Sequence, residues 1–533
     1  MSGSTGPAWW DAALVAAYVP ALVMLGAWAS RRQAHPEDYF LASRGSRWPA
    51  IGLALLASNI SSTALIGLAG AAYATGISVY DYEWSAAVVL VFFCVFLLPF
   101  VLSSRVYTMP EFLERRYDAR ARLYFALLTL FLNVMVDAAA ALYSGSLVIR
   151  VLFPGTPLWV IVSVLAGAAA LYTLLGGLRA VIYTETVQGV LLLAGALVIA
   201  VTAFARAGGW QAVMTGVPPE MVSLIRPVGD PGVPWPGLLF GIPVLGFYYW
   251  CTNQFIVQRV LSARSLEHGR GGALFAGALK LPVLFLMVLP GTCAILLFPH
   301  LARSDLVYPA LMFGLLPTGL LGVVAASFAA ATMASVASTL NSASALITMD
   351  IIRRMAPALS NQQVVRIGRL STAGLLLVAL LWAPQLENFR SLWQYLQAML
   401  AYAVPPIVAL FLGGLFWRGA NAAGAAATLA VGTACGIALF VGNVVFGVVH
   451  LHFLYAAPVL LLIDLSILVG VSLWTRERST APRAGAAVNR LIWTSAYFRE
   501  ESRRLRALPA WRNYRVQAAV LLALTACLVV AFR

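Results

Sequence analysis

Fourteen long apolar stretches constrain the fold of this chain more than any other feature of its sequence. Each has about 18 or more residues with few charges, which is the pattern of a membrane-spanning helix. Hydrophobic residues make up 61% of the 533 residues and charged residues only 10%. The stretches lie at 12–29, 49–74, 83–103, 122–148, 157–175, 182–205, 236–257, 271–298, 314–345, 368–385, 391–416, 420–446, 452–474 and 514–532. We therefore predict an all-α integral membrane protein with about 14 transmembrane helices.

The arginines predict how these helices are oriented. Cytoplasmic loops of membrane proteins carry an excess of basic residues. If the N-terminus lies outside, 28 arginines fall in inside loops and only six fall in outside loops. We expect a multi-pass protein of the plasma (inner) membrane with both termini extracytoplasmic. The net charge of +15 is then a topological and lipid-facing signal, so we expect membrane lipid and no nucleic acid as a partner.

The sequence lacks the motifs that are typical of several other classes of protein. The five cysteines form no CxxC pair and have no histidine at metal-ligand spacing, which argues against a disulfide framework or a zinc site. No HExxH or nucleophile-elbow motif supports a membrane enzyme. The N-terminus lacks the pattern of a cleavable signal, and no obligate protein partner is inferred. A channel or uncoupled facilitator is disfavoured because no pore loop is repeated.

Two of the apolar stretches carry signs of interruption. In Trp48–Gly76 the middle reads ASNISST, a run of small and hydroxylated residues at mid-membrane depth. In Gly241–Phe255 a glycine and a proline precede three aromatics and a polar tail. Hydroxyls in a span can also bond to the preceding turn or join helices. The two stretches lie five spans apart, however, and interrupted helices at matching positions of two halves indicate an inverted-repeat transporter.

Lys280 is the only lysine of the chain and lies within the apolar stretch 271–298. A charge at the bilayer centre costs at least about 2.5–3.5 kcal/mol, so such a group normally faces a cavity and has a partner. The alternative is a side chain that extends its amine to the membrane surface. Lys280 is about ten residues from the nearer span end, which is deep for that. We predict an ion pair with Glu83, at the start of the third span.

Seven motifs carry a resemblance to a known family. In chain order they are EDYFLASR, ASNIS, YEW, YTMPEFLERRY, YTLLGGLRAVIYTETVQ, YYWCTNQFIVQRVLSA and ASTLNSASALITMDI, and the resemblance runs from about Asp38 to Gly442. The chain resembles the sodium/solute symporter family and is similar to its bacterial sodium/sugar and animal sodium–glucose branch. The resemblance implies a LeuT-type 5+5 inverted-repeat core with broken first and sixth core helices, one extra helix before it and three after it.

This resemblance divides the chain into seven parts. We expect an extra helix and cytoplasmic loop at 1–47, the first repeat at 48–205, an extracytoplasmic loop at 206–235, the second repeat at 236–416, two extra helices at 417–474, a basic cytoplasmic segment at 475–513 and a final helix at 514–533. The basic segment is expected to lie at the lipid headgroups without a direct role in transport.

The resemblance also implies a sodium site. Carried over, its ligands fall on Ala57, Ile60, Ala331, Ala334 and Ser335. The family usually has two adjacent hydroxyl residues where this chain has Ala334 and Ser335, so one side-chain ligand is missing. The alternatives are replacement by Thr332, Ser338 or a water, a weaker sodium site, or coupling to protons. Alanine at 337, where members moving two ions have a hydroxyl, favours one Na+ per cycle. Glu185 matches a carboxylate associated with ion release, or it pairs with Arg179.

The solute site is implied in the same way. The resemblance assigns Glu83, Lys280 and Gln397 to sugar hydroxyls, and Tyr249 with Trp250 to stacking and gating. Asn59 and Thr63 in the first interrupted stretch complete the expected set of substrate-binding residues. Ala64, Ala86 and Gly246 stand where sugar carriers often have polar side chains, which leaves the particular solute open. Asp137 and Asp464 are unassigned; Asp137 is a candidate proton site if sodium is not the coupling ion.

The sequence thus predicts a secondary active transporter that couples one Na+ to a neutral sugar or polyol by alternating access. A symporter of another small solute, such as sialic acid, an amino acid or an organic acid, driven by sodium or protons, is the alternative.

Overall fold

The computed structural model describes residues 45–475 and 491–533 except 105, 107, 353, 354 and 357, together with residues 9–11, 13, 14, 16–18 and 24. Side chains are described for all of these except 172–188, 341, 345, 349, 350, 361, 362 and 365. The predicted first span, most of 1–47, and residues 476–490 of the basic segment therefore lie outside the described residues. The described part folds into helices, and its two β-bridges are isolated.

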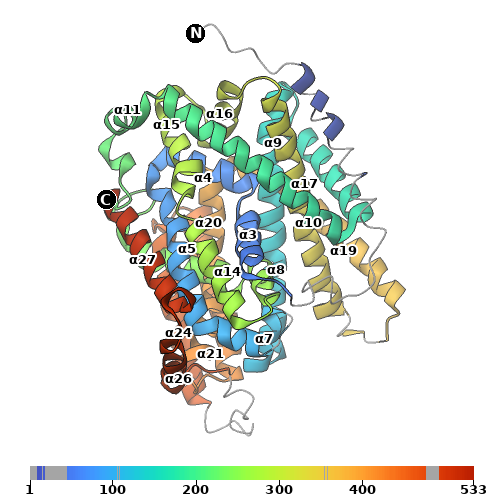
Figure 1. Cartoon of the computed structure of the whole chain (residues 1–533). Coiled ribbons are helices and arrows are strands. Elements are labelled where there is room, and N and C mark those ends of the chain that lie inside the picture. Colours follow the sequence, from blue (N-terminus) through green and yellow to red (C-terminus); the bar gives the residue numbers. More distant parts are fainter. Residues whose placement is uncertain are drawn as a thin grey trace.

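The first half of the chain forms the helices α3 (Trp48–Asn59), α4 (Ser62–Thr75), α5 (Asp81–Phe92), α6 (Leu98–Ser104), α7 (Met109–Arg116), α8 (Ala119–Leu132), α9 (Ala139–Leu152), α10 (Leu158–Arg206) and α11 (Gly209–Gly216). The second half forms α12 (Ile242–Phe247), α13 (Gln254–Leu261), α14 (Leu266–Leu279), α15 (Leu289–Leu297), α16 (Val307–Leu315), α17 (Leu320–Ala345), α19 (Asn361–Trp382), α20 (Leu392–Ala403), α21 (Pro405–Phe416), α22 (Ala422–Ala427), α23 (Thr433–Phe440), α24 (Phe453–Trp474), α26 (Ser495–Arg506) and α27 (Tyr514–Ala531). Figure 1 shows most of the long helices running between two ends of the molecule, one marked by α16 and the other by α26.

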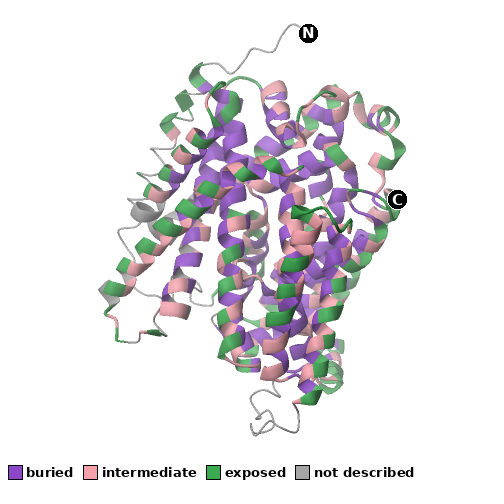
Figure 2. Ribbon diagram, turned by 180° about the vertical axis from the view of Figure 1, so that it is seen from behind, coloured by how far each residue is buried: buried purple, intermediate pink, exposed green. Residues whose placement is uncertain are grey.

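The described helices fit a protein that crosses the membrane many times. Eight are long and apolar enough to span, and the number rises to eleven if each of three bent pairs is one span. Large apolar side chains such as Leu239, Leu462 and Leu381 are more than half exposed on the outside of the bundle, where Figure 2 shows exposed residues covering the outer helices. An apolar outer surface of this kind suits contact with lipid.

The structure differs from the predicted spans at α10. The sequence separated two spans here, at 157–175 and 182–205, whereas α10 runs from Leu158 to Arg206 as one helix that crosses the molecule obliquely (Figure 1). No proline falls in these 49 residues, so nothing in the covalent chain blocks the helical hydrogen bonds. The predicted loop was placed on polar and glycine residues that a helix tolerates.

Both predicted interruptions are present. α3 ends at Asn59 and α4 begins at Ser62, with a bend of 62° between them. Ile60 and Ser61 are extended, and the Ser61 hydroxyl accepts a hydrogen bond from the amide of Ala64. In the second stretch the π-helical segment Tyr248–Thr252 ends at Asn253, which is extended and whose side chain accepts from the amide of Phe255. Each break therefore uses a polar side chain to cap the helix that follows.

A third break changes the position of Lys280. The sequence treated 271–298 as one span, but α14 and α15 are bent by 41° about the residues between them. Lys280 is the C-cap of α14, and the amides of Lys280 and Leu281 bond back three residues to Gly277 and Ala278. Pro282 explains the break, because it has no amide hydrogen and its ring clashes with the carbonyl four residues earlier. Lys280 thus lies at a bend and not within a continuous helix.

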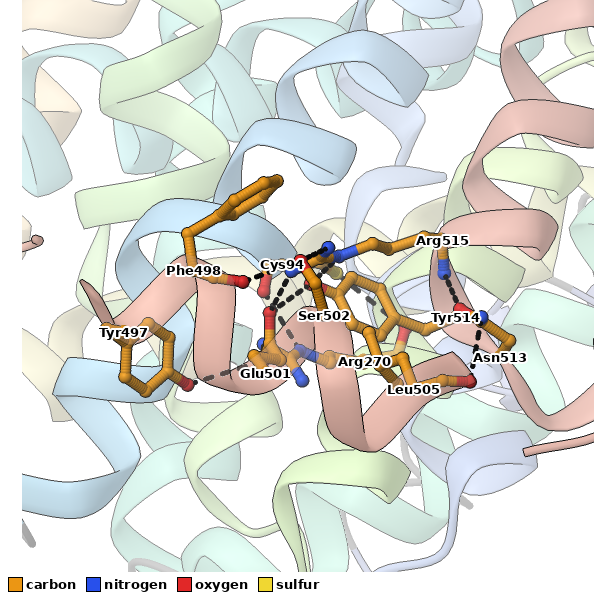
Figure 3. Close-up of polar contacts among 10 residues, drawn as sticks. All are labelled: Cys94, Arg270, Tyr497, Phe498, Glu501, Ser502, Leu505, Asn513, Tyr514 and Arg515. Atoms are coloured by element: carbon orange, nitrogen blue, oxygen red, sulfur yellow. Dashed lines mark hydrogen bonds and ion pairs between the residues drawn. The ribbon is translucent and has the colours of Figure 1, made fainter. Parts of the chain in front are cut away.

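The basic segment is attached to the protein at α26. Figure 3 shows Glu501 of α26 between two guanidiniums, those of Arg270 at 2.5 Å and Arg515 at 2.7 Å. The Tyr514 hydroxyl donates to the same carboxylate at 2.9 Å, and the Arg270 guanidinium lies 3.9 Å from the centre of the Tyr514 ring. Arg270 also donates to the carbonyl of Cys94. This cluster joins α26 to α14 and α27.

The charge of Glu501 is stabilised by these contacts. Burial favours its protonated form, but Arg270 and Arg515 outweigh burial and hold the pKa of the carboxyl below its usual value of 4.5. Because the pKa of the folded state is depressed, the resulting stability is present above the pKa of the unfolded chain and is lost as the pH falls through the folded value.

We expect Glu501→Gln to lower the free energy of unfolding by about 3–5 kcal/mol, because Arg270 would stay buried without its counter-charge. Thermal unfolding of the purified protein in detergent measures the loss. The matched control is Glu500→Gln, since Glu500 pairs with Arg504 and both side chains are more than 60% exposed. Such a helical pair contributes only about 0.2–0.5 kcal/mol. Equal losses in the two variants would contradict the assignment, as would a difference that persists unchanged well below pH 4.5.

Candidate functional site

A cavity of about 190 Å³ lies where the two interrupted stretches face α5, α8, α17 and α20. It is lined by Ser58, Asn59, Ser61, Thr63, Ala64, Tyr82, Glu83, Leu132, Asn133, Val136, Asp137, Ala140, Ala141, Ile242, Leu245, Gly246, Tyr248, Tyr249, Trp250, Asn253, Phe255, Ser335, Thr339, Ser342, Trp393, Leu396, Gln397 and Leu400. Irregular backbone at membrane depth is tolerated only where protein or water surrounds it. The cavity therefore accounts for both breaks.

The predicted ion pair between Lys280 and Glu83 is present. The Lys280 ammonium donates to the Glu83 carboxylate and to the side-chain carbonyl of Asn59. It also lies 5.2 Å from the centre of the Trp250 ring, on the second interrupted stretch. The exposed fractions of the two side chains are only 1% and 6%. One ammonium thus holds together α14, α5, α3 and the segment that carries Trp250.

Lys280 itself does not line the cavity. Glu83, Asn59 and Trp250 do, and Lys280 lies behind them. The bend at Pro282 keeps it there, because the Tyr80 hydroxyl donates to the carbonyl of Leu281 at 3.0 Å and fixes the turn against the start of α5. Lys280 can therefore affect a bound solute only by orienting the side chains of Glu83 and Asn59, which do line the cavity.

The remaining predicted solute residues share the cavity wall. Asn59 donates to the Tyr249 hydroxyl at 3.2 Å, and the rings of Tyr249 and Trp250 meet edge to face with centres 5.1 Å apart. Gln397 lines the cavity from α20, and Thr63 lines it from the start of α4. The predicted solute residues thus contribute a carboxylate, two amides, a hydroxyl and two aromatic rings to the wall.

The departures from the sugar-carrier pattern also fall partly on this wall. Ala64 and Gly246 line the cavity, whereas Ala86 is buried with 1% exposure and does not. A β-carbon at Gly246 would lie 3.2 Å from Val89, so a larger side chain there would have to displace a neighbour. Close packing against Val89 therefore helps to keep a larger polar side chain out of position 246.

Two of the five predicted sodium ligands sit at the first break. Ala57 and Ile60 lie in the last turn of α3 and just after it, where helix carbonyls lose their helical partners. Ser335 of α17 lines the same cavity, while Ala331 and Ala334 are buried in α17 with 8% and 1% exposure. Carbonyl and hydroxyl oxygens are the hard donors that an alkali cation uses, so these residues fit the ion. The set remains a prediction.

Thr332, a predicted replacement for the missing hydroxyl next to Ser335, is buried and hydrogen-bonded, and its role at the ion site stays a prediction. The Thr332 hydroxyl bonds to Ser62 at 3.2 Å and to the carbonyl of Phe328 at 3.0 Å. Ser62 in turn meets Ser144 at 3.1 Å, and Thr63 meets Ser144 at 3.3 Å. These hydroxyls join α4 to α9 and α17. Glu185, the predicted ion-release residue, lies outside the described side chains.

Some residues of the site were not assigned from the sequence. Tyr82 and Trp393 line the cavity and pack edge to face, with ring centres 5.5 Å apart. Trp393 also covers Gly67, where a β-carbon would lie 2.9 Å from its ring. Asp137 lines the cavity as well. The sequence signal for Asp137 was an acid in an apolar span; the aromatic pair had no signal beyond composition.

Comparison with known proteins gives the relatives of the chain. A family model described as the sodium:solute symporter family matches residues 39–432. Sodium/glucose cotransporter 4 of Danio rerio is 34% identical over 545 residues, covering 92% of this chain and 82% of the relative. Sodium/myo-inositol cotransporter 2 of Mus musculus is 34% identical over 535 residues, covering 91% and 79%.

Solved structures show the fold. A Na+-coupled sialic acid symporter, substrate-bound and outward-open, matches with a TM-score of 0.73 at 21% identity, over 89% of this chain and 99% of that one. Mhp1, a nucleobase-cation-symport-1 family transporter in a closed conformation, matches with 0.53 at 15%, over 86% and 100%.

Helices broken around a central cavity, in an arrangement shared with these structures, define an integral membrane transporter of the LeuT fold and not an enzyme. The chain belongs to the sodium:solute symporter family, as the sequence motifs indicated, and it is a sodium-coupled symporter of a small solute. We propose below which solute it carries and which residues bind that solute.

We expect Lys280→Met to lower the free energy of unfolding by about 3–5 kcal/mol, because Glu83 would stay buried without a counter-charge. The double variant Lys280→Met with Glu83→Gln should recover most of that loss, since neither side chain then carries a charge. Thermal unfolding in detergent measures both. Glu387→Gln is the control, because Glu387 pairs with Arg150 at the surface with side chains 38% and 49% exposed, and exposed pairs contribute about 0–1 kcal/mol. A single variant as stable as the parent would contradict the pair.

Proposed function

We propose that this protein couples the inward movement of one Na+ to uptake of a neutral sugar or polyol by alternating access. The observation that carries the proposal is the buried Lys280–Glu83 pair, which presents one carboxylate and the Asn59 amide to the cavity in fixed positions. A solute with several hydroxyls can donate to Glu83 and exchange hydrogen bonds with Asn59 and Gln397. The apolar face of a sugar ring suits contact with Tyr249 or Trp250.

The relatives support the same solute class. Sodium/glucose and sodium/myo-inositol cotransporters are among the proteins to which the chain is 34% identical. Sialic acid is the alternative solute, since a sialic acid symporter shares the fold. Myo-inositol and glucose carry no charge, whereas sialic acid carries a carboxylate, so a panel of these compounds separates the two readings.

The proposed sodium site accounts for coupling. Sodium bound by the carbonyls of Ala57 and Ile60, the Ser335 hydroxyl and the carbonyls of Ala331 and Ala334 would stabilise the break between α3 and α4. Asn59 and Thr63 flank that break and line the cavity. Ion binding then raises the affinity for the solute, and by linkage the solute raises the affinity for the ion by the same factor.

The placement in the membrane is part of the proposal. The excess of arginines in alternate loops supports a plasma (inner) membrane orientation with both termini extracytoplasmic. This orientation requires an even number of spans, so the two predicted spans 157–175 and 182–205 are counted separately although α10 is one helix. With that orientation the Tyr82–Trp393 pair covers the cavity on the extracytoplasmic side and α26 lies on the cytoplasmic side. The pair is then an outer gate that separates when the transporter opens outward.

Uptake into proteoliposomes tests this function. We expect a sodium gradient to drive accumulation of at least one of glucose, mannose and myo-inositol, and Lys280→Ala to weaken the apparent affinity at least about 30-fold, because truncating one partner of a buried charge pair costs about 2–5 kcal/mol. Ser335→Ala should raise the sodium concentration needed for half-maximal uptake. Ser163→Ala is the matched control, since Ser163 on α10 bonds only to its own helix in the described structure. Accumulation that follows a proton gradient and ignores sodium would contradict the ion assignment.

A further inference from the structure

Asp137 stands apart from the other acids around the cavity. It belongs to the π-helical segment Asn133–Ala138 between α8 and α9, its side chain is exposed, and it lines the cavity. Because Asp137 is among the residues that line the cavity, part of this exposed surface faces the cavity. Among the described residues no group donates a hydrogen bond to Asp137 or forms an ion pair with it.

The local backbone explains why an acid can point into the cavity here. A π-helical turn inserts an extra residue into a helix and turns the following side chains relative to a regular α-helix. The Tyr395 hydroxyl of α20 donates to the carbonyl of Met135 within this segment at 2.6 Å. That contact fixes the segment while using the only hydroxyl proton of Tyr395, so the proton is not available to Asp137.

Two other buried carboxylates, Glu83 and Asp305, are compensated by basic groups. Asp81, next to Tyr82, accepts from the Trp84 indole at 2.7 Å while its other oxygen has no partner among the described residues, but Asp81 does not line the cavity. Glu83 accepts from Lys280, as described above. Asp305 accepts from the amide of Leu392 at 2.9 Å and from the hydroxyl of Tyr143 at 3.3 Å, and it pairs with Arg303. Neither an arginine nor a lysine nor a histidine is among the described residues that line the cavity. With Lys280 behind the wall balancing Glu83, Asp137 is the acid of the cavity lining that has no basic partner among the described residues.

A buried carboxylate without a partner is unfavourable unless a bound group compensates it. Asp464 shows the contrast: it is fully buried against Gly432, and neither of its oxygens has access to the cavity. Asp137 faces a space that a solute fills, so a solute's own donors can provide the missing hydrogen bonds. A second carboxylate brought into this space would instead place like charges together, which binding sites use to exclude wrong ligands.

We propose that Asp137 sets the charge selectivity of the solute site: it accepts hydrogen bonds from hydroxyl or ammonium groups of the solute and excludes solutes that carry a carboxylate. The inference rests on the proposed sugar transport and narrows its substrate class. Neutral polyhydroxylated compounds and protonated amino sugars bind, and sugar acids do not. The sialic acid alternative is thereby disfavoured for this chain.

Three sugars of matched size test the proposal. Glucose, glucosamine and glucuronate share a pyranose ring and differ by a neutral, a cationic and an anionic substituent. In proteoliposomes at saturating sodium, each competes with uptake of whichever radiolabelled neutral sugar or polyol the parent protein accumulates. For the parent we expect glucosamine to inhibit at least as well as glucose, and glucuronate to inhibit at least about tenfold more weakly, a difference of 1.4 kcal/mol.

Asp137→Asn removes the charge and keeps the shape of the side chain. We expect it to reduce the ratio between glucuronate and glucosamine inhibition constants at least about tenfold, while Asp137→Glu keeps the parent's ratio. Asp464→Asn is the control, because it removes an acid away from the cavity and should leave the ratio unchanged. The comparison of the three sugars on the parent protein needs no variant. It can therefore still refute the proposal if a variant fails to fold.

Two results would overturn the proposal. One is a parent that takes glucuronate as readily as glucose. The other is an Asp137→Asn variant with unchanged selectivity but fewer sodium ions moved per solute, which would make Asp137 a ligand of a coupling ion. Both differ from failure of the proposed function, in which the parent shows no sodium-driven uptake of any sugar or polyol.

Discussion

The need to satisfy backbone polar groups inside a membrane governs this structure. In hydrocarbon an unpaired amide or carbonyl costs several kcal/mol, so a helix can break only where protein or a cavity provides partners. The chain breaks α3 from α4 at Ile60 and Ser61, and the second interrupted stretch breaks at Asn253. Both breaks face one cavity. The carbonyls freed there can bind an ion, and the neighbouring side chains can bind a solute, without any dedicated domain.

The buried ion pair makes this arrangement specific. Lys280 reaches Glu83 and Asn59 from a bend that Pro282 creates. An ammonium with three donors can bridge two acceptors on different helices, whereas a planar guanidinium would need a wider, more fixed geometry. Desolvation makes such a pair costly, and its value lies in fixing one arrangement of helices among several that apolar packing alone would allow. The pair therefore orders the cavity wall more than it stabilises the fold.

Much of this could be predicted from the sequence, because its signals are local. The lengths of the apolar stretches predicted the spans, and the ASNISST run and the glycine–proline stretch predicted the two breaks. Because an unpaired charge in a span is costly, the isolated Lys280 predicted an ion pair with Glu83. What the sequence could not give depends on packing between distant segments. The bend that moves Lys280 behind the wall, the continuous helix α10, and the direction in which Asp137 points follow from backbone geometry that composition does not record. The docking of α26 through Glu501 likewise depends on residues 231 positions apart.

The position of α14 connects the cluster around Glu501 with the cavity. Arg270 lies near the start of this helix and Lys280 at its end, ten residues later, which is about 15 Å along a helix axis. A helix of this length moves as a rigid body, so a tilt of α14 that carries Lys280 away from Asn59 also displaces Arg270 relative to Glu501 unless α26 moves with it. Both contacts of α26, to Arg270 on α14 and to Arg515 on α27, are short. Any such tilt therefore requires that α26 and α27 move together with α14, or that the ion pair at Glu501 opens.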